Sequence, residues 1–359
     1  MSSMPLSRAP AADALMRGHV LVRPGTIEFR ELPRPRPEPG GVVVRVRAAL
    51  TCGTDLKAYL RGHPKFPMPT LFGHEFAGEI AELGLGVRGV RDGDAVMAAP
   101  TAPCGDCYHC VRDQENLCEQ VMATMVHGAY AEYVNLPASI VRTNLYAKPA
   151  ALPFAEAALM EPLACVLHGL SRLRIRPDDT VVVIGAGAIG LLHLLVLRAR
   201  GVERLVVVAR NPARAALARA LGASAILAVD AAATPDLVMD ATAGRGADVV
   251  VECTGQVPVW EAALPLARRG GHVVLFGGCA AGTAVRFDTG RLHYDQVEIS
   301  SPFHFAPRDV RAAYELLGSG DFGGAALIAG AYPLEGLGEA LARHRSGDGP
   351  KFAIVPAGV

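Results

Sequence analysis

Residues 180–190 read Thr180-Val181-Val182-Val183-Ile184-Gly185-Ala186-Gly187-Ala188-Ile189-Gly190. The apolar run is typical of a parallel strand buried on both faces, and the three glycines follow it in the spacing G-x-G-x-x-G. Such glycines permit a tight turn and let backbone amides approach a pyrophosphate at a helix N-terminus. A chance glycine-rich turn is the alternative. The strand before the glycines and the apolar helix after them favour a dinucleotide-binding unit.

The pattern of alternating strands and helices continues beyond this unit. Strands are expected at 205–208, 224–229, 248–253, 272–277 and 297–300, with helices at 213–221 and up to Arg269, before Gly270-Gly271. This alternation predicts a doubly wound parallel sheet, the Rossmann fold. The predicted cofactor-binding residues are Gly185, Gly187, Ala188, Ile189 and Gly190, with Ala209, Arg210, Arg214, Thr254 and Gly277 after later strands.

The end of the strand at 205–208 bears on which dinucleotide binds. An NAD-binding fold places Asp or Glu about 20 residues after the glycines, on the ribose 2′-hydroxyl. This chain has Ala209 and Arg210 there, with Arg214 one helical turn later. Two guanidinium groups suit a 2′-phosphate, so NADP(H) is predicted to be preferred over NAD(H). The alternative is that both arginines are solvated cations, although the helix dipole disfavours cations at a helix start.

The first 157 residues have a different character. Short β-rich runs such as 19–22 and 42–46 are separated by Pro and Gly turns, which predicts a compact, mostly-β body. Helical spacing begins at 152–163, and helices near 309–317 and 334–344 precede a strand at 352–355. The expected division is a disordered extension at 1–17, a mostly-β catalytic domain at 18–157 and 303–359, and the Rossmann NADP-binding domain at 158–302.

Composition limits the possible partners. The chain has 359 residues, with 35 basic and 35 acidic side chains and a formal net charge of zero. This balance argues against nucleic acid or an anionic membrane surface as a partner and favours a small-molecule substrate. No apolar run has the length of a membrane span, and residues 1–17 lack the apolar core of a signal peptide. A cytoplasmic location is therefore expected.

The segment from Cys52 to Glu75 carries the first metal signal. It contains Cys52-Gly53-Thr54-Asp55 and then Gly73-His74-Glu75. A thiolate, an imidazole and a carboxylate suit Zn²⁺, and three protein ligands with one open position are typical of a catalytic zinc site. The Thr54 hydroxyl would lie beside this metal and carry a proton.

A second metal signal consists of four cysteines. Cys104, Cys107, Cys110 and Cys118 are separated by two, two and seven residues. Four thiolates this close predict a closed structural zinc site. Free or disulfide-bonded thiols are the alternative, which a reducing compartment disfavours. A bound zinc would fold the loop, because the loop has few apolar residues of its own.

These motifs, within residues 20–356, resemble those of the zinc-dependent medium-chain dehydrogenases. The Cys52-Gly53-Thr54-Asp55 and Glu161-Pro162 segments are most similar to the sorbitol (polyol), threonine and glucose dehydrogenase branch. The resemblance implies a GroES-like catalytic domain, a Rossmann domain and an active site in the cleft between them. It also implies two zinc ions per chain, one catalytic and one structural.

The resemblance also implies roles for individual residues. Cys52 and His74 would bind the catalytic zinc, while Glu75 and Glu161 compete for the third position or exchange with water. By itself, Glu161 before a proline could equally be a solvated helix residue at a strained or kinked position. Asp55 would orient His74.

One departure from the family pattern matters. Lys57 stands where many relatives have a relay histidine, which leaves the proton route beyond Thr54 open. The remaining cysteines, at 165, 253 and 279, match no motif and are interpreted as small buried hydrophobes.

The expected function is a zinc-dependent oxidoreductase that transfers a hydride between NADP(H) and a secondary alcohol or ketone, such as a polyol or sugar. The alternatives are a zinc-free enone or quinone reductase and a non-catalytic NADP-binding protein. Candidate pocket residues are Tyr59, His127 and 303–305. A homodimer or homotetramer is expected, and an edge strand near 284–287 could extend a sheet across the subunits.

Overall fold

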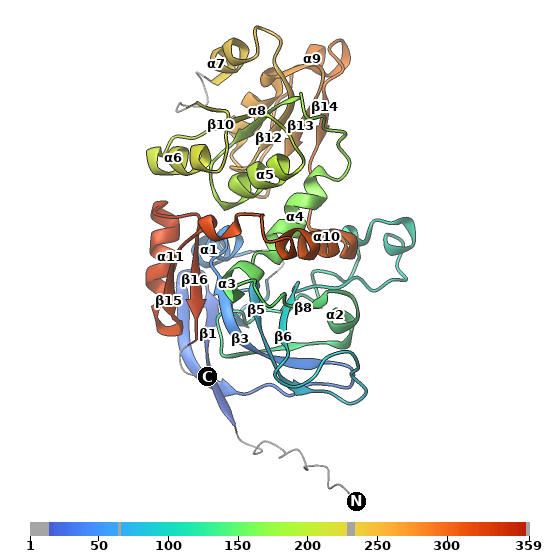
Figure 1. Cartoon of the computed structure of the whole chain (residues 1–359), viewed down its shortest axis with the longest axis vertical. Coiled ribbons are helices and arrows are strands. Elements are labelled where there is room, and N and C mark those ends of the chain that lie inside the picture. Colours follow the sequence, from blue (N-terminus) through green and yellow to red (C-terminus); the bar gives the residue numbers. More distant parts are fainter. Residues whose placement is uncertain (1–13, 64–65, 228–233, 357–359) are drawn as a thin grey trace, which may run out of the picture.

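A computed structural model describes residues 14–63, 66–227 and 234–356 of the chain. Two bodies lie end to end in it: a Rossmann domain above and a domain built on a mixed β-sheet below, here called the mixed-sheet domain (Figure 1). Helices α4 (Met160–Leu170) and α10 (Pro307–Gly318) pack against each other near the junction.

The Rossmann domain contains a six-stranded parallel sheet in the order β11-β10-β9-β12-β13-β14. This order is the doubly wound arrangement, in which strand order reverses beside β9 and leaves a crevice for a dinucleotide. Its strands are β9 (Thr180–Ile184), β10 (Arg204–Val208), β11 (Ala225–Leu227), β12 (Ala247–Glu252), β13 (Ala267–Leu275) and β14 (Glu298–Ser300). Its helices are α5 (Ala188–Ala199), α6 (Pro212–Ala220), α7 (Thr234–Ala241), α8 (Val257–Ala263), η3 (Leu264–Leu266) and α9 (Thr289–His293).

Two predictions for this domain need correction, and a third extends beyond the described residues. No helix reaches Arg269: α8 ends at Ala263, and Gly270 and Gly271 lie inside β13. The pairing of β12 with β13 shifts register beside these glycines, so they mark an irregularity within a strand and do not stop a helix. Residues 284–287 form no strand in the described chain, and the predicted strand at 224–229 is described only as far as Leu227.

The mixed-sheet domain is built on a seven-stranded sheet in the order β15-β16-β3-β5-β6-β8, with β7 also paired to β3. A smaller sheet, β2-β1-β4, packs beside it. The strands are β1 (Leu15–Arg23), β2 (Thr26–Pro33), β3 (Val42–Leu50), β4 (Thr70–Leu71), β5 (Phe76–Leu83), β6 (Ala95–Ala98), β7 (Tyr133–Leu136), β8 (Leu145–Ala147), β15 (Ile328–Pro333) and β16 (Lys351–Val355). The helices are α1 (Gly53–Arg61), α2 (Ala138–Thr143), α3 (Phe154–Ala157), α11 (Leu337–Ser346), η1 (Cys110–Arg112), η2 (Glu115–Leu117), η4 (Gly324–Leu327) and η5 (Leu334–Gly336).

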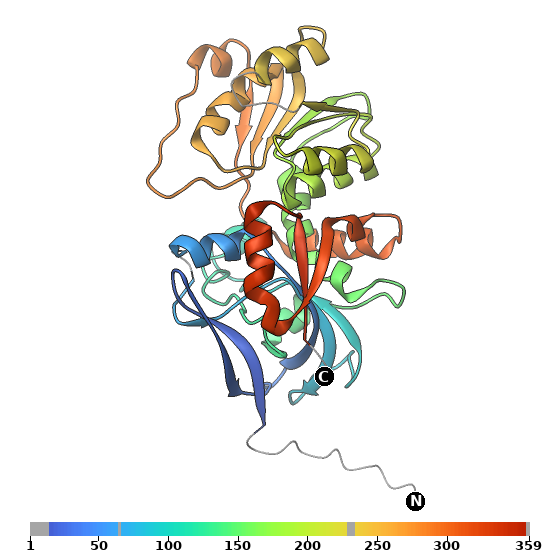
Figure 2. The same cartoon turned by 90° about the vertical axis from the view of Figure 1, so that its left-hand side faces the viewer.

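The C-terminal segment returns to this domain. β16 pairs antiparallel with β3, with Ala353 opposite Leu50, and α11 lies beside the β1–β2 hairpin in the turned view (Figure 2). Strand β1 begins at Leu15, so the predicted disordered extension is wrong for residues 15–17, and residues 1–13 lie outside the described residues. The domain boundaries at 157/158 and 302/303 stay predictions.

The predicted helix at 152–163 consists of two helices. α3 ends at Ala157 and α4 begins at Met160, so Pro162 lies in the first turn of α4. Proline is tolerated there because the amides of the first turn have no partner within the helix. Glu161 is therefore not at a kink.

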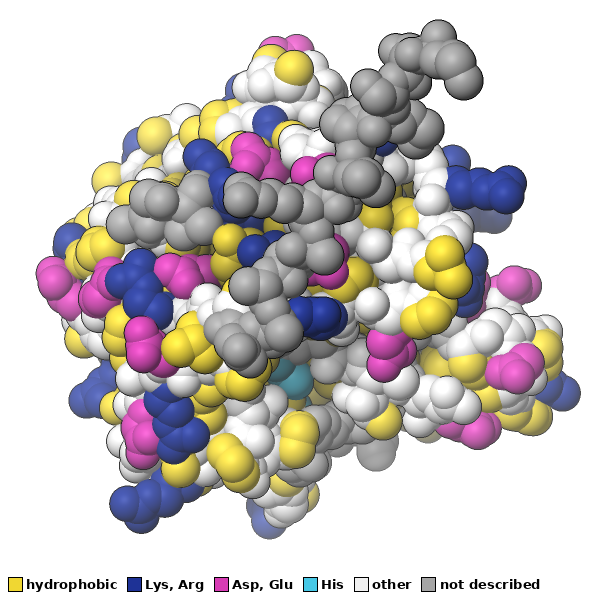
Figure 3. Space-filling model, turned by 90° about the horizontal axis from the view of Figure 1, so that it is seen from below, with side chains coloured by type: hydrophobic (Ala, Val, Ile, Leu, Met, Phe, Trp, Pro, Cys, Tyr) yellow, Lys and Arg dark blue, Asp and Glu magenta, His cyan; other side chains and the backbone are white. Residues whose placement is uncertain are grey.

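The face of the molecule at the mixed-sheet end agrees with the balanced composition. Seen from the mixed-sheet end, basic and acidic side chains are interspersed among apolar ones (Figure 3). Among the described residues, no helix is both long and apolar enough to cross a membrane.

Candidate active site

Strand pairing brings the two halves of the first metal motif together. β3 and β5 are antiparallel, with Ala49 opposite Phe76, so the residue after β3 and the residues before β5 share one end of the sheet. Cys52 lies at this end, in an extended conformation, and caps α1 by accepting a hydrogen bond from the Thr54 amide. Gly73 has φ +87°, and a side chain there would meet the Tyr130 ring at 2.7 Å. Glycine at position 73 is thus required by both backbone and packing.

The resulting cluster has the donors of a catalytic zinc site. Potential ligand atoms of Cys52, His74 and Glu75 all lie within 4.8 Å of one another. His74 and Glu75 are buried, while Cys52 is partly exposed. Sulfur, nitrogen and oxygen donors in such a set suit Zn²⁺. Thr54, also partly exposed, lies in the first turn of α1, two residues after Cys52.

The contact expected between Asp55 and His74 is present. His74 Nδ1 donates to Asp55 Oδ1 at 2.9 Å, which leaves Nε2 as the nitrogen for a metal. Tyr130, a residue that the sequence did not single out, donates its hydroxyl to Asp55 Oδ2 at 2.8 Å. Burial opposes the charged form of Asp55, but its pKa is lowered overall because His74 and these hydrogen bonds stabilise the carboxylate.

Glu75 has a partner that sequence reasoning missed. Lys351 Nζ, at the start of β16, lies 2.7 and 2.5 Å from the two carboxylate oxygens of Glu75 and 3.1 Å from the Thr51 carbonyl. Both side chains of the pair are buried. Burial raises the pKa of Glu75 to about 7, against the opposing effect of the Lys351 ammonium. Lys351 therefore holds both carboxylate oxygens that Glu75 would offer to a metal. A lysine directly before an apolar C-terminal strand was the available sequence signal.

Glu161 lies near this cluster but groups with other residues. Its carboxylate is buried on α4, and one of its oxygens is within 4.8 Å of potential ligand atoms of Cys165 and His304. Burial raises the pKa of Glu161, and the charges of His74 and Lys351 act to lower it, so Glu161 is within electrostatic reach of the first cluster. The sequence predicts Cys165 to be a small buried hydrophobe. That interpretation is incomplete, because Cys165 Sγ contacts Glu161 Oε1 at 3.6 Å.

The other predicted residues are distributed as follows. Lys57 is exposed on α1, and its charge acts on Cys279 of the Rossmann domain. The His127 ring packs edge-on against Phe66, 4.6 Å between centroids, and Phe66 in turn lies beside His74. Tyr59 lines a separate cavity with His19 and Leu341. Within 303–305, Phe303 is 43% exposed, His304 joins Glu161, and Phe305 is a core residue.

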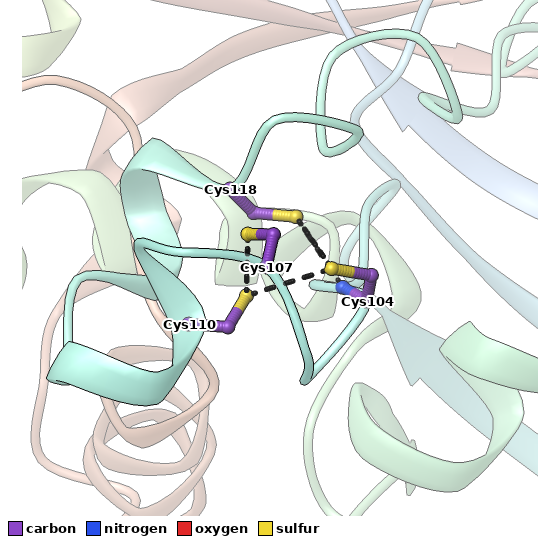
Figure 4. Close-up of side chains that lie close together, drawn as sticks. All are labelled: Cys104, Cys107, Cys110 and Cys118. Atoms are coloured by element: carbon purple, nitrogen blue, oxygen red, sulfur yellow. Dashed lines mark hydrogen bonds between the residues drawn. The ribbon is translucent and has the colours of Figure 1, made fainter.

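The four cysteines converge in a loop at the edge of the mixed-sheet domain (Figure 4). Cys107 and Cys118 each place Sγ 3.5 Å from a neighbouring sulfur, and the Cys104–Cys110 separation is 3.9 Å. A disulfide requires about 2.05 Å, so these are free thiols. Zinc with bonds of about 2.3 Å to four tetrahedral thiolates places the sulfurs about 3.8 Å apart. The cage therefore fits a structural zinc.

The glycine loop is shaped for a dinucleotide. Gly185 has φ +101°, and a Cβ at Gly190 would lie 1.8 Å from the Gly185 carbonyl oxygen. Gly187 caps the N-terminus of α5, and its missing Cβ would meet only Arg214 Nη1, at 3.9 Å. Backbone amides at this helix start are therefore accessible to an anion. Ala188 and Ile189 form the first turn of α5.

The remaining predicted cofactor residues lie at the same edge of the parallel sheet. Ala209 is buried after β10, and Arg210 is exposed. Arg214, partly buried, donates from Nε to the Gly347 carbonyl of the mixed-sheet domain at 3.3 Å. Thr254 follows β12 and donates its hydroxyl to Glu252, and Gly277 follows β13. Glu252 is a further residue that the sequence did not reveal.

Comparison with known proteins accounts for both halves of the chain. The family model described as "Alcohol dehydrogenase GroES-like domain" matches residues 38–144, and "Zinc-binding dehydrogenase" matches residues 188–319. A sorbitol dehydrogenase from Halalkalibacterium halodurans is 31% identical over 95% of this chain and 99% of its own length. A D-altritol 5-dehydrogenase from Agrobacterium fabrum is 34% identical over 72% of this chain and 75% of its own length.

Structural comparison agrees with these matches. A protein from Sinorhizobium meliloti 1021, described as a zinc-binding dehydrogenase and bound to NADP, superposes with a TM-score of 0.87 at 29% identity, over 96% of this chain and 100% of its own. The predicted α/β fold, with a GroES-like domain and a Rossmann domain, is thereby confirmed, as is the oxidoreductase class. The chain belongs to the zinc-dependent medium-chain dehydrogenase family.

Proposed function

We propose that this protein oxidises a secondary alcohol of a polyol or sugar-like substrate, or reduces the corresponding ketone, with NADP(H) as the hydride carrier. The observation that carries this proposal is the Cys52–His74–Glu75 cluster, whose ligand atoms lie within 4.8 Å of one another. The polyol assignment is supported by the sorbitol and D-altritol dehydrogenases among the relatives.

The residues of the cluster have separable tasks. Cys52 and His74, with Glu75 or Glu161 as the third ligand, would hold a zinc ion, which supplies a Lewis acid for the substrate oxygen. Asp55 fixes the His74 ring through Nδ1. Thr54 lies in the first turn of α1, two residues after Cys52, and is proposed to take the substrate proton. Lys57, exposed one turn further along α1, is the candidate for passing that proton to solvent.

Lys351 is proposed to select between the two glutamates. While the Lys351 ammonium binds both oxygens of Glu75, it compensates the negative charge of that carboxylate. A metal that recruits Glu75 must break this ion pair, whereas Glu161 has no such cation bonded to it among the described contacts. Exchange of the third ligand is thus coupled to Lys351.

The direct test is turnover by purified, zinc-loaded protein with a panel of polyols and NADP⁺. Cys52→Ala and His74→Ala should each lower kcat at least about 100-fold without changing NADPH affinity, since they remove metal ligands. Cys253→Ala, which replaces a thiol outside every ligand group among the described residues, is the matched control. Full turnover by a demetallated, folded enzyme would refute the zinc mechanism.

The two zinc ions and the alternative functions are tested by elemental analysis. Two zincs per chain are expected, one in the Cys52 cluster and one in the four-cysteine cage. A single zinc with enone or quinone reduction would favour the zinc-free reductase. NADPH binding without turnover of any alcohol or carbonyl substrate would favour a binding protein.

The NADP(H) preference is supported by the arginines after β10. No acidic residue occurs from 209 to 214, and Arg210 is exposed at the cofactor edge. Arg210→Ala should lower kcat/KM for NADP⁺ about tenfold while leaving NAD⁺ nearly unchanged, because a 2′-phosphate loses a charged partner. Arg219→Ala, an exposed arginine near the end of α6, is the control. Equal or better efficiency with NAD⁺ in the wild type would refute the preference.

Assembly and location complete the proposal. β14 pairs only with β13 in the described chain, so its outer edge is available for another subunit. Tyr294, next to this strand, is 76% exposed. We therefore propose a homodimer or homotetramer, which light scattering would test. Eight unpaired thiols fit a reducing compartment, so we place the protein in the cytoplasm.

A further inference from the structure

A third group of potential metal ligands lies beside the catalytic cluster. We propose that Glu161, Cys165 and His304 form a second, weaker zinc position that inhibits the enzyme when occupied. This position draws on the same Glu161 carboxylate that can serve the catalytic metal. Zinc would therefore act on this protein at three places: as a structural ion, as a catalytic ion and as an inhibitor.

The donor geometry supports a metal position. Ligand atoms of the three residues all lie within 4.8 Å of one another. Glu161 and Cys165 are four residues apart on α4 and project from the same helix face, where Cys165 Sγ contacts Glu161 Oε1 at 3.6 Å. His304 adds an imidazole from a distant segment. The set contains one sulfur, one nitrogen and one oxygen donor, as the catalytic cluster does.

An independent observation is the way His304 is held. It has φ +61°, a left-handed conformation that is uncommon for a residue other than glycine. Its Nε2 is 2.8 Å from Oγ1 of the buried Thr101, and the neighbouring Phe303 carbonyl accepts a hydrogen bond from Asn116 Nδ2 at 3.0 Å. The hydrogen bond to Thr101 therefore fixes the orientation of the His304 ring, whose imidazole supplies the nitrogen donor of the proposed position. Backbone strain held in place by surrounding contacts is typical of functional positions.

The position of Glu161 explains why a metal there would inhibit. Glu161 belongs to the second group of ligands and is also within electrostatic reach of His74 and of the Glu75–Lys351 pair. A zinc bound by Cys165 and His304 would draw the Glu161 carboxylate to itself. The catalytic metal would then depend on Glu75, which Lys351 holds. Occupation of the second position therefore removes a ligand from the first.

The primary test is a metal titration, which does not depend on the dehydrogenase assignment. Wild-type protein carrying two zinc ions is titrated with Co²⁺, because cobalt bound to a thiolate absorbs in the near ultraviolet. A third equivalent is expected to bind and to give this band. Cys165→Ala and His304→Gln should each weaken the third equivalent at least tenfold, and Cys165→Ala should abolish the band. Cys253→Ala removes another partly exposed thiol, one that belongs to no ligand group among the described residues, and should titrate as the wild type does.

Two results would overturn the proposal. One is wild-type protein that binds no third equivalent. The other is a third equivalent that binds Cys165→Ala and His304→Gln as tightly as the wild type. The use of two separate ligand variants keeps the test valid if one of them does not fold.

The inhibitory effect is tested separately and rests on the proposed function. Zinc is added to the two-zinc enzyme, and each variant is compared with its own rate before addition. Wild-type activity is expected to fall as the third equivalent binds, with an inhibition constant at least tenfold higher in Cys165→Ala. Identical inhibition of the wild type and Cys165→Ala would overturn the regulatory role. If no polyol is turned over at all, that result counts against the proposed function. The metal titration then still tests whether the second zinc position exists.

Discussion

Substitution of Gly187 by alanine separates cofactor binding from folding. Gly187 has φ −78° and ψ −177°, a conformation that alanine adopts without strain. The added Cβ would meet no described protein atom closer than Arg214 Nη1, at 3.9 Å. The methyl group would instead occupy the space above the N-terminus of α5, where a pyrophosphate is expected to approach the backbone.

The structure sets the size of both effects. Alanine at an unstrained glycine position leaves the free energy of unfolding unchanged or raises it by about 0.4–1 kcal/mol, because the unfolded chain loses conformational freedom. NADPH affinity should fall at least tenfold, which is about 1.4 kcal/mol of binding free energy. Gly190→Ala is the contrasting variant. Its Cβ would lie 1.8 Å from the Gly185 carbonyl oxygen, and the backbone must move to relieve the overlap. A loss of about 1–3 kcal/mol of folding stability or more is expected there.

The assay combines NADPH fluorescence titration with urea unfolding of the zinc-loaded protein. Gly187→Ala should unfold at the wild-type urea concentration or above it and bind NADPH weakly. Gly190→Ala should unfold earlier. Wild-type NADPH affinity in a folded Gly187→Ala protein would refute the placement of the pyrophosphate on this loop. A stability loss in Gly187→Ala as large as that in Gly190→Ala would refute the steric reasoning.

Three further perturbations probe other parts of the molecule. Lys351→Met should lower the free energy of unfolding by about 3–5 kcal/mol, because it leaves the Glu75 carboxylate buried without its cation. Urea unfolding measures this loss, with the exposed Lys57→Met as the control. A loss of under about 1 kcal/mol would contradict the prediction. Burial lowers the pKa of His193 from 6.5 to about 4. Between these pH values the unfolded chain binds a proton that the folded protein excludes. The free energy of unfolding therefore falls as the pH drops through this range. The contribution of His193 to the slope of unfolding free energy against pH approaches about 1.4 kcal/mol per pH unit. His193→Leu should flatten the plot of unfolding free energy against pH in this range. Parallel plots for the wild type and the variant would contradict the assignment. Cys110→Ser should reduce the zinc content by one ion per chain, because it removes one thiolate from a four-sulfur cage; elemental analysis that still finds two zincs would show that the cage is not a zinc site.

Some features could be predicted from sequence because they depend on neighbours in the chain. The strand at 180–184 and the glycines that follow it specify the βαβ unit within one short stretch, and β9 has the predicted bounds. The four-cysteine cage is equally local, since its ligands span 15 residues. A sequence-based prediction is wrong where the same residue type fits two kinds of structure. Gly270 and Gly271 were read as a helix stop, but they lie within β13, because glycine also marks strand irregularities.

The active site shows where local reasoning ends. Residue types and spacing identified Cys52, His74 and Glu75, and the antiparallel pairing of β3 with β5 brings them together. Asp55, the partner of His74, is only 19 residues away, but two other contacts in and around the site join residues that are distant in sequence. Lys351 is separated from Glu75 by 276 positions, and Thr101 from His304 by 203. No periodicity or motif spans such distances.

The sequence by itself therefore determined the two-domain architecture, the dinucleotide loop and the types of metal ligand, because strand propensity, glycine conformation and donor chemistry act over short segments. Only the tertiary structure decided which cation neutralises Glu75 and which residues accompany Glu161. β16 returns the C-terminal Lys351 to β3, and α4 presents Cys165 beside Glu161 and opposite His304. The physical reason is that a buried charge must find its partner in space, and the pairing of distant strands and helices determines which side chains share the low-dielectric interior.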